Sequence, residues 1–177
     1  MRVIGGKIGG IRLNPPANLP VRPTTDLAKE ALFNILQHQL DWEGCECLDL
    51  FCGTGNISYE LTSRGVATVD AVDAHGKCLL YVKDVAKRYD LNIKTVRSDV
   101  FKFISSCKKQ YDFIFADPPY DLPQLPQLPQ LIIEGGLLKP QGILVVEHPS
   151  TRVLVEHPSF EETRKYGYSS FSFYQNK

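Results

Sequence analysis

The segment Leu48-Asp49-Leu50-Phe51-Cys52-Gly53-Thr54-Gly55 decides the fold that the sequence predicts. Its apolar residues belong to a run that starts at Cys45, and such a run is typical of a buried strand. The two glycines allow a tight turn and let a ligand approach the backbone, and ligands of open α/β sheets bind at this end of a strand. Asp49 can pair with a cationic amine, so we expect a ligand with an amino-acid part rather than a pyrophosphate.

Further strands and helices alternate after this segment. Helices are predicted over residues 56–64, 75–90 and 99–108, and strands over residues 68–72, 93–97, 111–116 and 142–147. Short apolar strands that alternate with helices predict an α/β fold, a doubly wound and mainly parallel sheet with helices on both faces. Residues 160–174 alternate in polarity and predict a terminal antiparallel hairpin.

The composition is that of one ordinary globular domain. The chain has 177 residues, 43% of them apolar, its formal net charge is zero, and no apolar run approaches the length that spans a bilayer. The first residues lack the apolar run of a signal peptide, so we expect a cytoplasmic protein without a membrane partner. Five cysteines without a Cys-x-x-Cys pair argue against a disulfide framework and against a metal site.

The first part of the chain is basic. Residues 1–25 contain no acidic residue and four basic ones, Arg2, Lys7, Arg12 and Arg22. Short β-prone pieces around pairs of glycines predict a small hairpin or a flexible arm, and a basic face can pair with phosphates even when the whole chain is neutral. The hydroxyl residues before Asp26 precede apolar residues at helical spacing, which predicts a capped amphipathic helix.

Two more carboxylates follow the next two predicted strands. Asp73 follows the second strand, where an acidic residue accepts hydrogen bonds from ribose hydroxyls, and Asp99 follows the third, where it can accept one from an adenine amino group. With Asp49 they match the amine, ribose and base of S-adenosylmethionine, although for Asp73 or Asp99 alone a helix N-cap would be the better explanation. Ser58 stands where a dinucleotide site has its third glycine. The predicted cofactor is therefore S-adenosylmethionine, and its binding turn also contains Phe51, Gly53 and Gly55.

The fourth predicted strand ends in Asp117-Pro118-Pro119-Tyr120, which has the groups needed to methylate an amino group. Two adjacent prolines fix the backbone, so the carbonyl of Pro118 and the carboxylate of Asp117 can accept both hydrogens of one –NH2 group. This grip aims the nitrogen lone pair at a methyl donor, and the aromatic ring of Tyr120 offers a face on which a base can stack. The alternative is a proline turn that merely ends a strand.

These motifs together resemble the RsmD family, which methylates the N2 amino group of a guanine in 16S ribosomal RNA. The resemblance covers nearly the whole length. It rests on Arg2-Val3-Ile4-Gly5-Gly6, Arg22-Pro23-Thr24-Thr25-Asp26, Glu30-Ala31-Leu32-Phe33-Asn34, Leu48-Asp49-Leu50-Phe51 with Gly53 and Gly55, Asp117-Pro118-Pro119-Tyr120, and Val146-Glu147. Asp-Pro-Pro-Tyr also occurs in adenine-N6 DNA enzymes, and the Arg-Pro-Thr-Thr segment makes the ribosomal family the better match.

The resemblance implies a Rossmann-like class I methyltransferase with a seven-stranded sheet whose last strand is antiparallel. It implies that Thr25 lies near the methionine end of the cofactor, and that the basic segment touches RNA in the small ribosomal subunit or its assembly intermediate. We therefore assign residues 1–24 to a basic N-terminal arm or hairpin and residues 25–177 to the methyltransferase domain. The residues expected to bind substrate are Arg2, Lys7, Arg12, Arg22 and Pro119.

Three departures from the family pattern and three alternatives remain. The segment after Arg12 lacks the extra basic residues that many relatives carry, which bears on how strongly this arm binds RNA. Cys52 stands where the family usually has alanine, and we do not expect it to act as a nucleophile; the prolines at 123, 126 and 129 predict a loop over residues 121–128 beside the site. An adenine-N6 DNA methyltransferase usually carries an added target-recognition region, for which 177 residues leave little room. An inert RNA-binding protein with this fold would not need the Asp-Pro-Pro-Tyr turn, and a nicotinamide dehydrogenase would need the third glycine.

Overall fold

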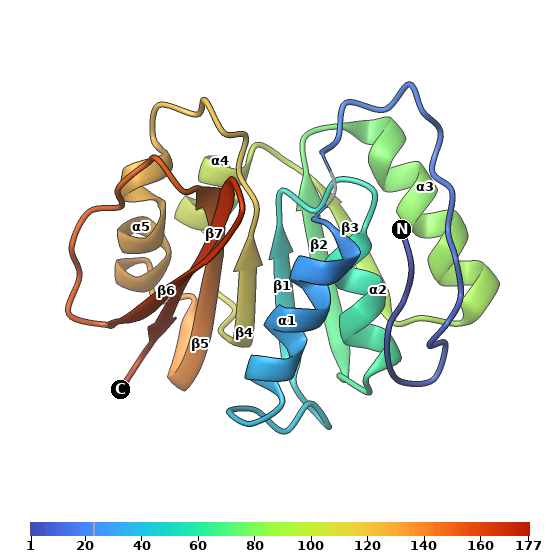
Figure 1. Cartoon of the computed structure of the whole chain (residues 1–177), viewed down its shortest axis with the longest axis horizontal. Helices are drawn as coiled ribbons and strands as arrows, with labels where there is room; N and C mark the ends of the chain where they lie inside the picture. Colours follow the sequence, from blue (N-terminus) through green and yellow to red (C-terminus); the bar gives the residue numbers. More distant parts are fainter. Residues whose placement is uncertain (23) are drawn as a thin grey trace.

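The computed structural model describes residues 1–22 and 24–177, so Pro23 of the Arg-Pro-Thr-Thr segment lies outside the described residues. The described residues form a seven-stranded sheet flanked by helices, in the strand order β3-β2-β1-β4-β5-β7-β6 (Figure 1). The strands are β1 (Glu46–Leu50), β2 (Thr68–Asp73), β3 (Ile93–Arg97), β4 (Tyr111–Ala116), β5 (Leu138–Pro149), β6 (Phe160–Tyr166) and β7 (Ser169–Gln175). The helices are α1 (Asp26–Leu36), α2 (Asn56–Ser63), α3 (Gly76–Tyr89), α4 (Val100–Ser106), the short 3₁₀ helix η1 (Leu125–Gln127) and α5 (Leu128–Glu134).

The sheet has the predicted topology. Strands β1 to β5 pair in parallel, and β7 lies antiparallel to both β5 and β6. The prediction of a doubly wound, mainly parallel sheet with an antiparallel last strand is therefore confirmed, and so is the terminal hairpin. One boundary was wrong, because β5 starts at Leu138 rather than at Gly142. The register of β5 against β4 shifts between Tyr111 and Phe113, and this irregularity accommodates the polar residues that hid the start of the strand.

Helices cover both faces of the sheet, and the alternation of side chains along each strand separates two cores. Phe113 and Phe115 of β4 point into a core shared with α1 and α2, where Leu32 of α1 is fully buried. Ile114 and Ala116 of the same strand point into the opposite core, against α4 and α5. The central strands β1, β2, β4 and β5 are therefore buried on both faces, which holds their carboxyl ends in a fixed position.

The N-terminal segment is a hairpin packed on the domain. Arg2 and Arg12 form an antiparallel bridge, and the N–H of Val3 donates to the carbonyl of Ile11 at 2.9 Å. Val3 is fully buried in a third apolar cluster that includes residues of α2 and α3, and Figure 1 shows this dark blue segment beside α3. Of the two predicted forms, a hairpin or a flexible arm, the structure has the hairpin.

A buried ion pair attaches this hairpin to the helices. Glu60 of α2 is fully buried and accepts hydrogen bonds from the backbone N–H groups of Ile4 at 2.8 Å and Gly5 at 2.9 Å. Its carboxylate also pairs with the fully buried Lys29 of α1 at 3.2 Å and with Arg64 at 2.8 Å. Burial alone would raise the pKa of Glu60, but these donors and cations outweigh it and leave the pKa below its ordinary value.

Across residues 1–22 and 24–177, no helix combines the length and the apolar character that crossing a membrane would require.

The Glu60 network makes a stability prediction. Glu60→Gln leaves Lys29 buried without an opposite charge, so we expect the free energy of unfolding to fall by about 3–5 kcal/mol in urea titrations followed by circular dichroism. The control is Glu162→Gln, which removes the exposed ion pair with Arg164 and is expected to change stability by about 0–1 kcal/mol. Equal losses of unfolding free energy in the two variants would contradict the prediction, because the buried pair would then contribute no more to stability than an exposed one.

Candidate functional site

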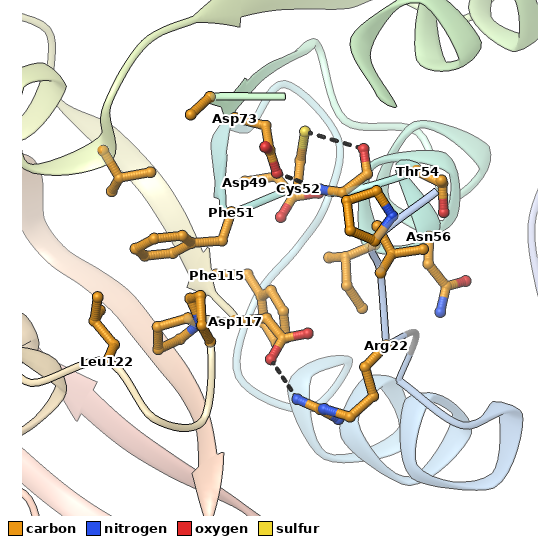
Figure 2. Close-up of a pocket in the computed structure, with 18 of the residues that line it drawn as sticks. Arg22, Asp49, Phe51, Cys52, Thr54, Asn56, Asp73, Phe115, Asp117 and Leu122 are labelled. Carbon is orange, nitrogen blue, oxygen red and sulfur yellow. Dashed lines mark hydrogen bonds and ion pairs between the residues drawn. The ribbon is translucent and has the colours of Figure 1, made fainter. Parts of the chain in front are cut away.

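The carboxyl ends of the strands surround a pocket of about 540 Å³, which is within the range of pockets for small ligands. The turns after β1, β2, β3 and β4 all contribute residues to it. Its lining includes Arg22, Thr24, Asp49, Phe51, Gly53, Asp73, Asp99, Phe101, Asp117, Pro118, Pro119 and Tyr120 (Figure 2). The structure therefore brings most of the predicted cofactor and catalytic residues into one cavity.

The strand register places the two central turns side by side. Leu50 of β1 is the partner of both Val72 in β2 and Ala116 in β4. Beyond the strands, the N–H of Asp117 donates to the carbonyl of Leu50 at 3.2 Å, and the N–H of Cys52 donates to the carbonyl of Val72 at 3.0 Å. The Asp-Pro-Pro-Tyr turn and the glycine turn therefore line the same pocket.

Asp49 is a buried carboxylate at the floor of the pocket. It is 1% exposed and accepts a hydrogen bond from Ser58 Oγ at 2.7 Å. Burial raises its pKa to about 7; Ser58 counteracts this, and the nearby Asp73 adds to it. Such a group gains strongly from an incoming cation, because the cation would compensate the charge that the protein leaves uncovered.

Asp73 and Asp99 both line the pocket, and both also hold backbone in place. Asp73 accepts from the N–H of Gly53 at 2.9 Å and from the N–H of His75 at 2.8 Å, so it shapes the glycine turn. Asp99 caps α4 by accepting from the N–H of Lys102 at 3.0 Å. The N-cap explanation thus holds for Asp99, and a second role toward a cofactor stays a prediction.

The glycine turn has strained backbone around an aromatic wall. Phe51 has a positive φ of 58°, which is uncommon for a residue with a side chain and is typical of functional sites. Its ring meets Phe101 edge to face at 6.4 Å between centroids, and both rings line the pocket. Gly55 has a φ of 92° and does not line the pocket; it is the N-cap of α2, and an added Cβ would be 2.6 Å from the Tyr59 ring.

A cation covers the predicted catalytic residues. Arg22 Nη2 lies 3.1 Å from Asp117 Oδ1, and Nη1 lies 3.4 Å from Glu147 Oε2. The centre of the guanidinium, Cζ, is 3.6 Å from the centroid of the Tyr120 ring. Figure 2 shows Arg22 pointing from its loop toward Asp117. Arg22, expected to contact substrate, is thus in direct contact with two of the residues expected to be catalytic.

The two carboxylates under Arg22 are electrostatically coupled. Glu147 is 1% exposed and Asp117 is 16% exposed. Burial, and then the charge of Glu147, raises the pKa of Asp117 well above its ordinary value, while Arg22 acts in the opposite direction. Burial also raises the pKa of Glu147, against hydrogen bonds from Thr24 and Arg22. The pair therefore needs a donor or a cation between its members.

Several predicted residues lie outside the pocket. Thr25 is exposed and caps α1 by accepting from the N–H of Ala28 at 3.2 Å, whereas the neighbouring Thr24 lines the pocket and donates to Glu147. The basic residues Arg2, Lys7 and Arg12 lie on the N-terminal hairpin, away from the pocket. Of the residues expected to bind substrate, Pro119 and Arg22 do line the pocket, and both are exposed.

Besides Thr24, sequence reasoning missed Phe101, Glu147 and Arg152 as contributors to this site. Phe101 had a signal in its position just after Asp99, and Glu147 had one in ending an apolar strand beside Asp117. Arg152 had none: its Nη1 donates to the carbonyls of Tyr120 at 3.1 Å and Leu122 at 2.7 Å, and so it fixes the Asp-Pro-Pro-Tyr turn. The segment predicted as a loop over residues 121–128 lies beside the site, because Leu122 and Gln124 line the pocket, but the prediction for its second half was wrong: it forms the 3₁₀ helix η1 (Leu125–Gln127), and Leu128 starts α5.

The cysteines and histidines form no centre of their own. In the part of the chain that the structure describes, no group of three or more His, Cys, Asp or Glu residues is placed to hold a metal ion. Cys52 lines the pocket but is buried, and burial raises the pKa of its thiol well above the ordinary value. A thiol in that state is a weak nucleophile.

Comparisons with known proteins agree with this geometry. The family model described as "Conserved hypothetical protein 95" matches residues 1–175. A putative rRNA methyltransferase of Bacillus subtilis is 35% identical over 185 residues, covering 100% of both chains. Ribosomal RNA small subunit methyltransferase D of Escherichia coli is 29% identical, covering 83% of this chain and 74% of that protein. A solved structure, a putative methyltransferase of Escherichia coli, is 26% identical with a TM-score of 0.84, covering 100% and 98% of the two chains.

The fold and its pocket define a Rossmann-like class I methyltransferase, a class that takes its methyl group from S-adenosylmethionine. Within this class, the chain belongs to the family of "Conserved hypothetical protein 95", the RsmD family. The predicted family and the predicted class of cofactor are thereby confirmed.

The glycine turn generates a prediction with an internal control. Gly55→Ala introduces a side chain at positive φ and a 2.6 Å clash with Tyr59, whereas Gly65→Ala has a similar φ of 100° and nothing within 4 Å. We expect Gly65→Ala to lower the free energy of unfolding by about 1–2 kcal/mol, and Gly55→Ala by about 1–3 kcal/mol more. Thermal unfolding of both variants measures the difference, and identical losses would mean that Tyr59 does not constrain the turn.

Proposed function

We propose that this protein uses S-adenosylmethionine to methylate the N2 amino group of a guanine in 16S ribosomal RNA, within the small subunit or its assembly intermediate. The observation that carries the proposal is the 3.2 Å hydrogen bond from the Asp117 N–H to the Leu50 carbonyl. This bond holds the Asp-Pro-Pro-Tyr turn, which can bind an amino group, beside the glycine turn, which is suited to the cofactor. Relatives named as ribosomal RNA methyltransferases support the class of substrate.

The residues of the pocket fit the cofactor. Asp49 is suited to the ammonium group, because its buried carboxylate has little compensation of its own. Asp73 would accept hydrogen bonds from the ribose hydroxyls, and Phe51, Phe101 and Asp99, which also line the pocket, would contact the adenine. When bound, S-adenosylmethionine would supply a methyl group on a positively charged sulfur; an amino nitrogen would bond to the methyl carbon as the carbon–sulfur bond breaks, with S-adenosylhomocysteine as the leaving group and a proton lost from the nitrogen.

The Asp-Pro-Pro-Tyr turn prepares that nitrogen. Asp117 Oδ1 and the Pro118 carbonyl accept the two amino hydrogens, which turns the lone pair toward the methyl group. Tyr120 stacks on the base, and Arg152 keeps the turn rigid through its carbonyls. Transfer is in line and needs no covalent enzyme intermediate, in keeping with the raised pKa of Cys52.

The basic N-terminal hairpin is the proposed contact with RNA. Lys7 and Arg12 are exposed on it, so both can reach phosphates, while Arg2 is half-buried. The hairpin is anchored by Glu60, so the charges are presented from a fixed position relative to the pocket. An adenine-N6 DNA methyltransferase remains the second candidate, because the same turn can grip that amino group.

The first prediction for this function separates chemistry from binding. Asp117→Ala is expected to lower kcat on undermethylated small subunits by about 10²–10³-fold, because one acceptor of the amino group is lost, while the Kd for S-adenosylhomocysteine changes little. Asp121→Ala, an exposed carboxylate on the same loop, is the control and should keep its rate, as should Cys52→Ala. Methyl transfer to DNA but not to small subunits would instead identify the second candidate.

The second prediction concerns pH. With a pKa of about 7, Asp49 is largely protonated at pH 6 and must lose its proton to pair with an ammonium group. Affinity for S-adenosylhomocysteine should therefore rise about tenfold between pH 6 and pH 8, as measured by calorimetry. Asp49→Asn should bind more weakly and with no such slope; a slope that persists in this variant would exclude Asp49 as its source.

A further inference from the structure

Arg22 occupies the place where the proposed function needs a base. Its guanidinium lies flat enough on Tyr120 to bring Cζ within 3.6 Å of the ring centroid, which is a stacking distance. At the same time its two terminal nitrogens reach Asp117 at 3.1 Å and Glu147 at 3.4 Å. A base that stacked on Tyr120 and donated to Asp117 would collide with it.

The chemistry of this contact identifies one base. A guanidinium is a planar carbon that carries three nitrogens, with hydrogens on neighbouring nitrogens that form a fork of donors. Guanine contains the same unit around C2, where the N1–H and the N2 amino group lie side by side. Adenine and cytosine have a lone pair next to their amino group instead. That lone pair would face the carboxylate of Glu147 and be repelled.

We infer that Arg22 is a built-in stand-in for guanine: it closes the base subsite until a guanine displaces it, and Glu147 then selects guanine by accepting its N1–H. This inference rests on the proposed function and adds a gate and a specificity-determining residue to it. In the exchange, the N2 amino group takes the position of Nη2 at Asp117, N1–H takes that of Nη1 at Glu147, and C2 replaces Cζ over Tyr120.

The surroundings allow the exchange. The Arg22 side chain is 48% exposed, so it can leave toward solvent without opening a core. Glu147 is held from behind by Thr24, whose hydroxyl donates to Oε1, which leaves Oε2 aimed at the base subsite. Asp117 and Glu147 repel each other when both are charged, and therefore an empty subsite is unfavourable. The pair is occupied either by the arginine or by the donors of a base.

The test uses the full chain saturated with S-adenosylhomocysteine and three probes that share one phosphate: guanosine, adenosine and 2-aminopurine riboside 5′-monophosphates. Arg22→Ala should bind the guanosine probe at least fivefold more tightly than the unchanged protein does, with adenosine binding unchanged. Arg164→Ala is the matched control, because Arg164 is also 48% exposed and pairs with Glu162 of the same strand, β6. This variant should change neither the guanosine nor the adenosine affinity. Weaker binding of all probes to Arg22→Ala would overturn the inference, because Arg22 would then be a phosphate contact.

A second measurement isolates Glu147. In Arg22→Ala, the affinity for the guanosine probe should exceed that for the 2-aminopurine probe about tenfold, because only guanosine has the N1–H that Glu147 accepts and hydrogen bonds to charged groups are among the stronger ones. Adding Glu147→Gln should reduce this ratio to below threefold. A purely structural role of Glu147 would lower both affinities together and keep the ratio, which would overturn its assignment.

Two further arms keep the outcomes separate. If Arg22→Ala does not fold, Arg22→Lys retains the charge but lacks the planar fork, and it should still bind guanosine several-fold more tightly than the unchanged protein. Methylation of small subunits by the unchanged protein reports on the proposed function itself. Activity there, together with no gain of guanosine binding in Arg22→Ala or Arg22→Lys, would overturn the gate and leave the function standing.

Discussion

The functional half of this molecule depends on parallel strands that end in register. Because Leu50 is level with both Val72 and Ala116, the turns that follow these strands are forced to share one edge of the sheet. Helices on both faces bury every central strand, so the edge cannot slide. Residues that the sequence keeps far apart thereby become neighbours, and the backbone bond between Asp117 and Leu50 is the local sign of it.

The chain uses buried carboxylates in two opposite ways. Glu60 is compensated by buried groups, the N–H groups of Ile4 and Gly5 and the ammonium of Lys29, and these contacts attach the first residues to α1 and α2. Around Asp117 and Glu147 the compensating group is a half-exposed arginine on a loop. The hydrogen-bond partners of Glu60 belong to the folded core and cannot be replaced by a ligand. The partner of Asp117 and Glu147 can be exchanged for a ligand, which is what a binding site requires.

Most of the fold could be predicted from local patterns in the sequence. The period of apolar residues located the strands and helices, and a hydroxyl before an amphipathic stretch gave the cap of α1, at Thr25. What depends on distant pairing was missed. The start of β5 was hidden by a register shift against β4, and the meeting of Arg22 with Asp117 and Glu147 joins positions 95 and 125 residues apart. No local spacing encodes such a contact, nor does it tell that Thr24, rather than Thr25, faces the pocket.

The hydrogen bonds between Glu60 and the N-terminal hairpin also set an order of events during synthesis. Ile4 and Gly5 leave the ribosome early, yet their hydrogen-bond acceptor Glu60 follows 55 or more residues later. In β5, the N–H of Gln141 donates to the carbonyl of Asn176, so this hydrogen bond forms only after Asn176 has been added. The N–H groups of Ile4 and Gly5 therefore stay without this acceptor until α2 has been made, and the N–H of Gln141 stays without its own until Asn176 has been added.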